Sequence, residues 1–252
     1  MTIQDVVKKN RESLSSVDCF VTDEIYNNSP DNYGLPQHVR HLIDLPINTE
    51  LTYVDILMFL KNHLQNKRPK YVEIGVSVLK TFYQVANFLQ DSELYAFDIN
   101  KINPTISQKF NLTEEGSKIN KYSYKSNKIT HFKGDVFNEE DFTLFKKQVD
   151  GNVNIIFSDA HHTGEGLRAE FDSYIEEALA DDFILYYDDL QNPPMQKVFI
   201  DICKEHKEKN PLTTSAFFKV NGWLGQHEDS HINGIITSID MRKIFPFVNY
   251  ID

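Results

Sequence analysis

The chain has 252 residues and a formal net charge of -11, from 26 lysines and arginines against 37 aspartates and glutamates. This length suffices for one large domain with a buried core, and the negative charge disfavours nucleic acid as a partner because phosphates would be repelled. Its two cysteines form no disulfide framework and no CxxC metal site. Because no segment reads as a signal core or approaches the roughly 20 apolar residues that span a bilayer, we expect a cytoplasmic protein without a membrane partner.

Residues 1–50 differ from the rest of the sequence and are predicted to form an N-terminal helical or irregular extension, or lid, before a domain at 51–252. Residues 21–46 are polar and contain three prolines, and a loop this long is typically a lid, a binding loop or a disordered segment. His38, Arg40 and His41 are either groups that reach an anionic or sugar ligand, or a solvated surface.

Helix and strand patterns alternate after this extension. Thr52 and Asp55 are spaced as a capping box at the start of a helix. Buried strands are predicted at 71–76, 94–99, 129–135, 153–159 and 183–189, since these runs are short and rich in Val, Ile, Phe and Tyr. Helical stripes of apolar residues begin at Phe82, Leu167 and Met195.

This alternation favours a parallel sheet with helices on both faces. Residues 215–220 and 234–239 lack a helix between them and predict an antiparallel pair that closes the sheet. The polar stretch 101–128 is expected to be a second flexible element. The predicted fold is therefore α/β: a Rossmann-like, doubly wound, seven-stranded sheet, mostly parallel, with an antiparallel strand near one edge.

Acidic residues lie at the end of every predicted parallel strand, where ligands bind in such sheets. A single aspartate there often only caps a helix or turn, but all five strands share the feature. The residues, in chain order, are Glu73, Asp98, Asp135, Asp159 and the pair Asp188 and Asp189.

The first two strands end in a pattern typical of nucleoside binding. The sequence EIG places a glycine after the first strand, and Asp98 after the second is suited to accept hydrogen bonds from ribose hydroxyls. Neither GxGxxG nor GxxxxGK[ST] is present. These two observations favour a nucleoside ligand without a diphosphate.

The successive motifs YVEIGV, YAFDIN, FKGDVF, FSDAHH and LYYDDL resemble those of class I S-adenosylmethionine-dependent methyltransferases. Among these, the chain is most similar to metal-dependent small-molecule O-methyltransferases, including those acting on sugars, over roughly residues 50–240. The resemblance implies that Glu73 and Gly75 contact the methionine part of the cofactor, with Ser77 in the same binding loop. It also implies that Asp98 holds the ribose and that Asp135 lies near the adenine.

The same resemblance implies a metal site and a general base. Asp159, Asp188 and Asp189 would hold Mg²⁺ or Mn²⁺, and carboxylate oxygens are the hard ligands that these ions prefer. His162 would be the base, with His161 as the alternative. A metal ion lowers the pKa of a bound hydroxyl, and an imidazole can accept its proton near neutral pH.

One position departs from the family pattern E-x-G-x-x-x-G, because Leu79 stands where the last glycine is usual. Either its side chain crowds the methionine part of the cofactor or the loop follows a different path. A further polar stretch contains His227, Glu228, Asp229 and His231, which is either a second metal cluster or a plain polar turn. Trp223 is expected to serve packing.

The sequence thus predicts an O-methyltransferase that uses S-adenosylmethionine and a divalent metal ion. Its acceptor is expected to be a small polar molecule such as a sugar, a nucleotide-linked sugar or a capsule-type saccharide precursor. Two alternatives stay open: a non-catalytic cofactor-binding or scaffold protein, and a metal-dependent hydrolase. The resemblance also leaves a homo-oligomer possible.

Overall fold

The computed structural model describes residues 1–15, 51–77, 79–102, 107–220, 231–246 and 248–251. His38, Arg40, His41, Trp223 and residues 227–229, which the sequence singled out, lie outside the described residues.

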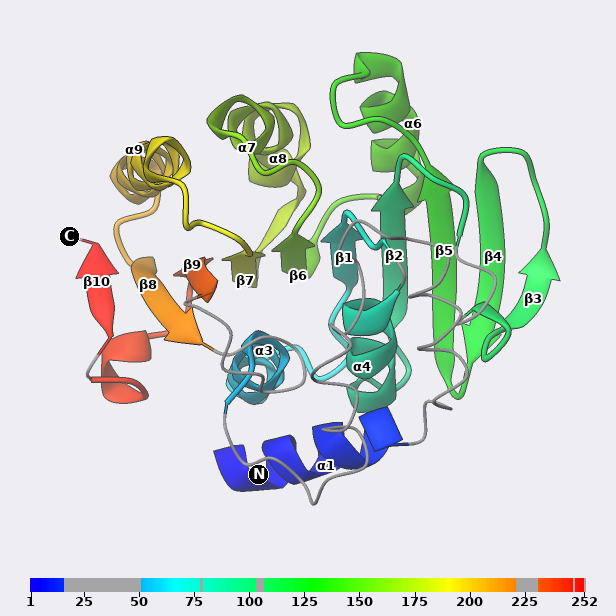
Figure 1. Ribbon diagram of the computed structural model, residues 1–252, viewed down its shortest axis with the longest axis horizontal. Coiled ribbons are helices and arrows are strands. Elements are labelled where there is room, and N and C mark those ends of the chain that lie inside the picture. The colour runs from blue at the N-terminus through cyan, green and yellow to red at the C-terminus, as the bar shows by residue number, and fades with distance from the viewer. Residues whose placement is uncertain (16–50, 78, 103–106, 221–230, 247, 252) are drawn as a thin grey trace, which may run out of the picture.

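One mixed sheet organises the described residues (Figure 1). Its ten strands have the spatial order β10-β8-β9-β7-β6-β1-β2-β5-β4-β3. Their bounds are β1 Tyr71–Ile74, β2 Glu93–Asp98, β3 Asn111–Glu114, β4 Ile119–Tyr124, β5 Asn127–Lys133, β6 Val153–Ser158, β7 Leu179–Tyr187, β8 Thr214–Val220, β9 His231–Thr237 and β10 Asn249–Ile251.

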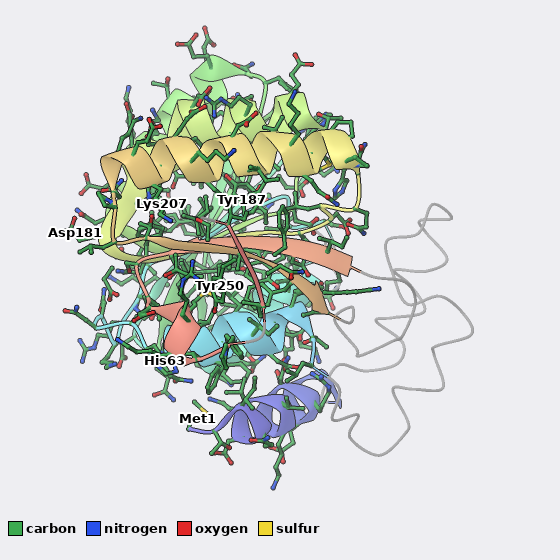
Figure 2. The ribbon with its side chains drawn as sticks, turned by 90° about the vertical axis from the view of Figure 1, so that its left-hand side faces the viewer. Met1, His63, Asp181, Tyr187, Lys207 and Tyr250 are labelled. Atoms are coloured by element: carbon green, nitrogen blue, oxygen red, sulfur yellow. The ribbon has the colours of Figure 1, made fainter. Side chains whose placement is uncertain are left out.

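Helices cover both faces of this sheet (Figures 1 and 2). On one face lie α6 (Glu139–Val149), α7 (Gly164–Glu170), a π-helical turn (Phe171–Ile175), α8 (Glu176–Ala178) and α9 (Pro193–Lys209). On the other lie α3 (Tyr53–Lys61) and α4 (Lys80–Phe88), with α1 (Ile3–Ser15) outside them. A short 3₁₀ turn (Met241–Lys243) precedes β10.

The central strands confirm the predicted Rossmann-like fold, although the sheet has ten strands where seven were predicted, because β3, β4 and β10 extend it at its two edges. Strands β5, β2, β1, β6 and β7 are neighbours in that order, and each pair is parallel. This is the order 3-2-1-4-5 of a doubly wound sheet, which reverses direction at β1. The predicted antiparallel pair is also present, since β9 pairs antiparallel with both β7 and β8.

The stretch 101–128 differs from its prediction as a flexible element. Residues 111–124 form the hairpin β3–β4, and β4 continues the sheet antiparallel to β5. The polar composition concealed one apolar face, on which Tyr122 and Tyr124 both contact the ring of Phe110. The hairpin is thereby attached to the main core beside α4, where Tyr83 packs on the same cluster.

Helix α1 is bound to α3 by a buried ion pair. The side chain of Arg11 contacts Asp55 with an N–O distance of 2.7 Å, and both side chains are almost fully buried. Asp55 also accepts the backbone N–H of Thr52 and so completes the predicted capping box. One carboxylate therefore caps α3 and fixes α1 at the same time.

Two apolar layers, one on each face, make up the core. The layer beneath α3 and α4 contains residues such as Leu57, Phe82 and Phe157, and the layer beneath α6 to α9 contains residues such as Phe97, Phe145 and Ile202. No helix in the described part of the chain combines the length and the apolar character needed to cross a membrane.

Candidate active site at the carboxyl ends of the strands

The parallel strands bring the predicted acidic residues to one edge of the sheet. In the register, Ile74 lies opposite Ser158, and Ser158 lies opposite Tyr187. The next residues, Asp159 and Asp188, therefore leave neighbouring strands side by side. This edge contains the switch point next to β1, which is where ligands bind in doubly wound sheets.

Asp159, His162 and Asp189 form a compact group at this edge. The imidazole Nε2 of His162 lies 4.0 Å from Asp159 Oδ1, and its Nδ1 lies 3.5 Å from Asp189 Oδ2. Each residue offers one ligand atom, and these atoms all lie within 4.8 Å of one another. Two donors of one Mg²⁺ ion are at most about 4.2 Å apart, so a small side-chain movement would suffice to bind the ion.

Electrostatic repulsion accompanies this grouping. Burial raises the pKa of Asp159 well above its usual value, and the carboxylates of Asp188 and Asp189 raise it further. Lys80 acts in the opposite direction. The side chains of Asp159 and Asp189 are still 21% and 32% exposed, so a cation from solution can reach them and relieve the repulsion.

Asp188 lies beside this group but faces another partner. It is only 6% exposed, and its Oδ1 accepts hydrogen bonds from the Asn233 side chain on β9 and from the backbone N–H of Asp189. The structure therefore brings Asp159 and Asp189 together with His162, and ties one oxygen of Asp188 to the neighbouring strand. Asn233 is a site residue that the sequence analysis missed.

Gly75 allows the loop after β1 to approach the loop after β6. Its φ is +85°, and a Cβ atom at this position would lie 2.4 Å from the carbonyl oxygen of Asp159. Any larger residue would push the two loops apart. The residue predicted to contact the cofactor thus also sets the distance between the first loop and Asp159.

The backbone of Leu79 has the left-handed conformation that favours glycine. Its φ is +65°, in the left-handed region, and it precedes the first residue of α4. The side chain is fully buried in the apolar layer under α4. The bulk of the Leu79 side chain thus lies in the core.

Asp98 holds the first loop in place. Its Oδ2 accepts hydrogen bonds from the backbone N–H groups of Val76 at 3.0 Å and Ser77 at 2.8 Å. Asp135 instead caps its own turn through the N–H of Phe137. Large apolar side chains follow both acids and face solvent, since Ile99 is 60% exposed and Phe137 48% exposed.

Glu73 is buried beneath this loop, where it accepts a hydrogen bond of 2.5 Å from the Tyr71 hydroxyl. Burial raises the pKa of Glu73 to about 8, an effect that outweighs the Tyr71 hydrogen bond and the nearby Lys80 charge. The protonated form therefore dominates at neutral pH in the ligand-free protein.

His161 points away from the acidic group, towards α7 and the loop after β5. Its ring makes an edge contact with Phe137, with 4.7 Å between ring centroids, and its Nδ1 lies 3.3 Å from Thr163 Oγ1. The two adjacent histidines therefore differ in surroundings, and His162 is the one beside the carboxylates.

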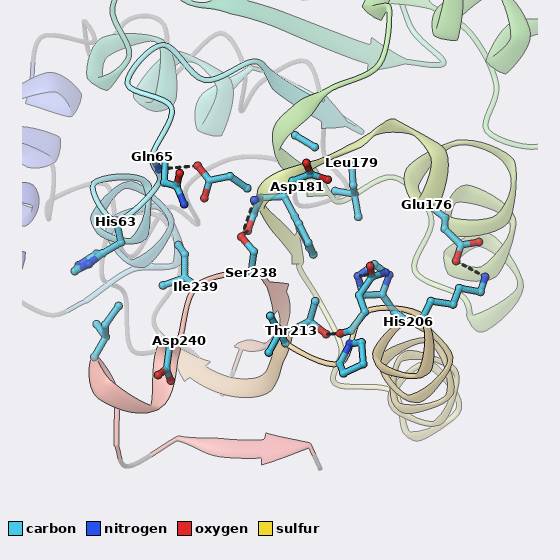
Figure 3. Close-up of a pocket in the computed structure, with 18 of the residues that line it drawn as sticks. His63, Gln65, Glu176, Leu179, Asp181, His206, Thr213, Ser238, Ile239 and Asp240 are labelled. Carbon is cyan, nitrogen blue, oxygen red and sulfur yellow. Dashed lines mark hydrogen bonds and ion pairs between the residues drawn. The ribbon is translucent and has the colours of Figure 1, made fainter.

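A cavity of about 990 Å³ lies elsewhere, at the opposite edge of the sheet (Figure 3). It lies where β7 begins and α9 ends, and its lining includes Leu179, Phe183 and His206. Its charged groups include the ion pairs Glu176–Lys209 and Asp240–Lys243. None of the acidic residues predicted for the cofactor or metal lines it.

The sequence matches no known protein-family model, and no curated protein is significantly similar to it. Several solved structures are similar in architecture. An O-methyltransferase from Bacillus cereus in complex with S-adenosylhomocysteine (SAH) is 11% identical, with a TM-score of 0.47, and the match covers 86% of this chain and 97% of that one. An rRNA methylase from Streptococcus thermophilus is 10% identical, with a TM-score of 0.46 over 74% of this chain and 96% of its own. A spermidine synthase from Thermotoga maritima is 11% identical, with a TM-score of 0.43 over 77% of this chain and 62% of its own.

Proposed function

We propose that this protein transfers a methyl group from S-adenosylmethionine to a hydroxyl oxygen of a small polar acceptor, with a divalent metal ion bound at Asp159 and Asp189. The acceptor class that we propose is a sugar or a saccharide precursor, on the basis of the sequence motifs. The observation that carries the proposal is the meeting of two features at one edge of the sheet: the loop after β1, and the Asp159–His162–Asp189 group.

The cofactor part of the proposal is supported by the surroundings of Asp98 and Asp135. Their carboxylates stand at the ends of neighbouring strands β2 and β5, and Ile99 and Phe137 expose apolar surface next to them. A ribose needs hydroxyl acceptors and an adenine needs apolar surface. Ile99 and Phe137 offer the apolar surface. Asp98, whose oxygens already accept the N–H groups of Val76, Ser77 and Asn100, is the acceptor that we propose for the ribose.

The metal part is supported by donor chemistry. The group offers two carboxylates, which are the ligands that suit Mg²⁺ or Mn²⁺, with one imidazole beside them. An ion bound there would lower the pKa of an acceptor hydroxyl.

His162 would accept the proton that leaves the acceptor, because its imidazole is 39% exposed and faces both carboxylates. A role as third metal ligand is the alternative for the same side chain. His162→Gln distinguishes the two: loss of turnover with retained Mn²⁺ affinity indicates the base, and loss of Mn²⁺ affinity indicates the ligand.

Calorimetric titration of the metal-stripped full chain with SAH tests the proposal directly. The titration is repeated with Mg²⁺ and with Mn²⁺, and Asp98→Ala serves as the variant with a damaged cofactor site. We expect the wild-type protein to bind SAH and the variant to bind it far more weakly.

Absence of SAH binding under every condition would overturn the methyltransferase proposal. A protein that binds Mn²⁺ but not SAH would instead be tested for phosphoesterase activity, since a metal-dependent hydrolase uses the same acidic group without a sulfonium donor. SAH binding without Mn²⁺ or Mg²⁺ binding would remove the metal from the proposal and leave the cofactor.

A further inference from the structure

A buried hydrogen bond joins the start of the acidic loop to the end of the following helix. Ser158 is the last residue of β6 and directly precedes Asp159, while Glu170 is the last residue of α7. The Ser158 hydroxyl donates to Glu170 Oε2 at 2.5 Å. The two residues are 6% and 1% exposed, so the bond is shielded from water.

The loop between these two residues is also fixed at its other end. Thr163 caps α7 by accepting the backbone N–H of Gly166 at 3.1 Å. Gly166 lies so close to the loop that a Cβ there would stand 2.6 Å from His161 Cβ. The Ser158–Glu170 hydrogen bond therefore closes the segment from Ser158 to Glu170 into a ring. The loop that carries Asp159 and His162 is part of this ring.

A purely structural role does not account for a glutamate at position 170, because burying its carboxyl group is unfavourable for folding. Its helix continues into the π-helical turn Phe171–Ile175, whose buried members Phe171, Tyr174 and Ile175 pack in the apolar layer. Burying a carboxyl among such side chains is unfavourable unless it is hydrogen-bonded, and an apolar residue would fill the space without that cost. Ser158 is the hydrogen-bond partner that the structure gives Glu170. Single π-helical turns are moreover frequent at functional sites.

We propose that Glu170 is a positioning residue of the metal site, which acts through Ser158 to fix the direction in which Asp159 leaves β6. This inference rests on the proposed function, because it takes Asp159 as a metal ligand. Groups that orient metal ligands without touching the ion typically change metal affinity about 10- to 100-fold when they are removed.

The test is Mn²⁺ binding to the full chain in the presence of SAH. Binding is measured through the electron paramagnetic resonance signal of free Mn²⁺. We expect Glu170→Leu to weaken Mn²⁺ binding at least about tenfold, and Glu170→Gln, which keeps an oxygen for the Ser158 hydroxyl, to stay within about threefold of wild type. Ser158→Ala removes the donor with little change in volume and is expected to match Glu170→Leu, with no further loss in the double variant. It keeps the test informative even if Glu170→Leu does not fold.

Ile175→Val is the matched control, because it alters the packing of the same helical segment without touching the loop. It should lower Tm slightly and leave Mn²⁺ affinity unchanged. Wild-type Mn²⁺ affinity in both Ser158→Ala and Glu170→Leu would overturn the positioning role while leaving the proposed function intact. Absence of Mn²⁺ binding by the wild-type protein would overturn the metal part of the proposed function, and the positioning role with it.

Discussion

The two edges of the sheet differ in how closely their carboxylates are grouped. At the amino edge of β7, carboxylates are matched by cations or backbone donors: Glu176 pairs with Lys209, and Asp182 accepts the N–H groups of Gln65 and Asn66. At the carboxyl edge, burial and then the carboxylates of Asp188 and Asp189 raise the pKa of Asp159, and Glu73 is buried beneath. The open cavity belongs to the first edge and the repulsion to the second.

We therefore base the functional proposal on the crowded carboxylates of the carboxyl edge and not on the volume of the cavity. Crowded carboxylates cost folding free energy, and groups with strongly shifted pKa values cluster at functional sites. The amino-edge ion pairs instead need nothing from outside the chain. The experiments below test whether the two edges differ as this comparison requires.

The largest effect is expected for Asp159→Asn. Mn²⁺ affinity should fall by at least about 100-fold, since a charged ligand is lost. The metal-free variant should also melt at a higher temperature than wild type at pH 7.5, because a charged carboxylate no longer has to be buried there or repelled by Asp188 and Asp189. Asp135→Asn is the control and should retain Mn²⁺ affinity. Unchanged Mn²⁺ binding in Asp159→Asn would remove this residue from the metal site.

Next in size is the pH dependence that Glu73 confers. The pKa of Glu73 in the folded protein is about 8 against an ordinary value of 4.5, so the folded state binds this proton more tightly. Its contribution to stability is complete at low pH and is lost as the pH rises from 4.5 towards 8. Glu73→Gln should remove this loss, on the order of 3 kcal/mol at pH 8. Urea unfolding of both proteins at pH 5 and pH 8 measures the difference, and parallel curves would contradict the shift.

Asp98→Ala is expected to have a smaller, selective effect on cofactor binding. The N–H groups of Val76 and Ser77 lose their charged acceptor, so the first loop loses its fixed shape. SAH affinity should fall about 10- to 100-fold, while Mn²⁺ affinity stays near wild type. Glu114→Gln, on the distant hairpin, is the control. Equal SAH affinity in wild type and Asp98→Ala would separate this loop from the cofactor.

The smallest effect is expected at the amino edge. Glu176→Gln breaks the pair with Lys209, which is largely exposed, so Tm should change by less than about 2 °C. Neither SAH nor Mn²⁺ affinity should change. A clear effect on either ligand would mean that the two edges are coupled, and the contrast between them would no longer hold.

The sequence alone predicts which acidic residues gather at the carboxyl edge. It does not predict how all of their side chains are oriented. Strand ends in a parallel sheet coincide, so the closeness of Asp159 and Asp189 follows from pattern alone. The orientation of Asp188 does not, because Asn233 lies 45 residues further along, on a strand whose register only the folded sheet fixes. The polar composition of the hairpin β3–β4 gave no sign of the ring contacts of Tyr122 and Tyr124 with Phe110, which attach it to the core. Leu79 was recognised as a departure, but its left-handed backbone and buried side chain are visible only in the fold.

The ion pair between Arg11 and Asp55 has a consequence for shortened versions of the chain. A chain that begins at residue 51 retains every residue predicted to bind the cofactor and the metal. The sequence alone therefore gives no reason to expect such a chain to be less stable. The shortened chain would nevertheless leave the fully buried Asp55 without Arg11, and breaking such a pair costs about 3–5 kcal/mol. Helix α3 would be affected first, and Tyr53 of that helix stacks on Phe157 directly beneath the acidic edge. The first fifteen residues are thus part of the support of the site, although none of them lies in it.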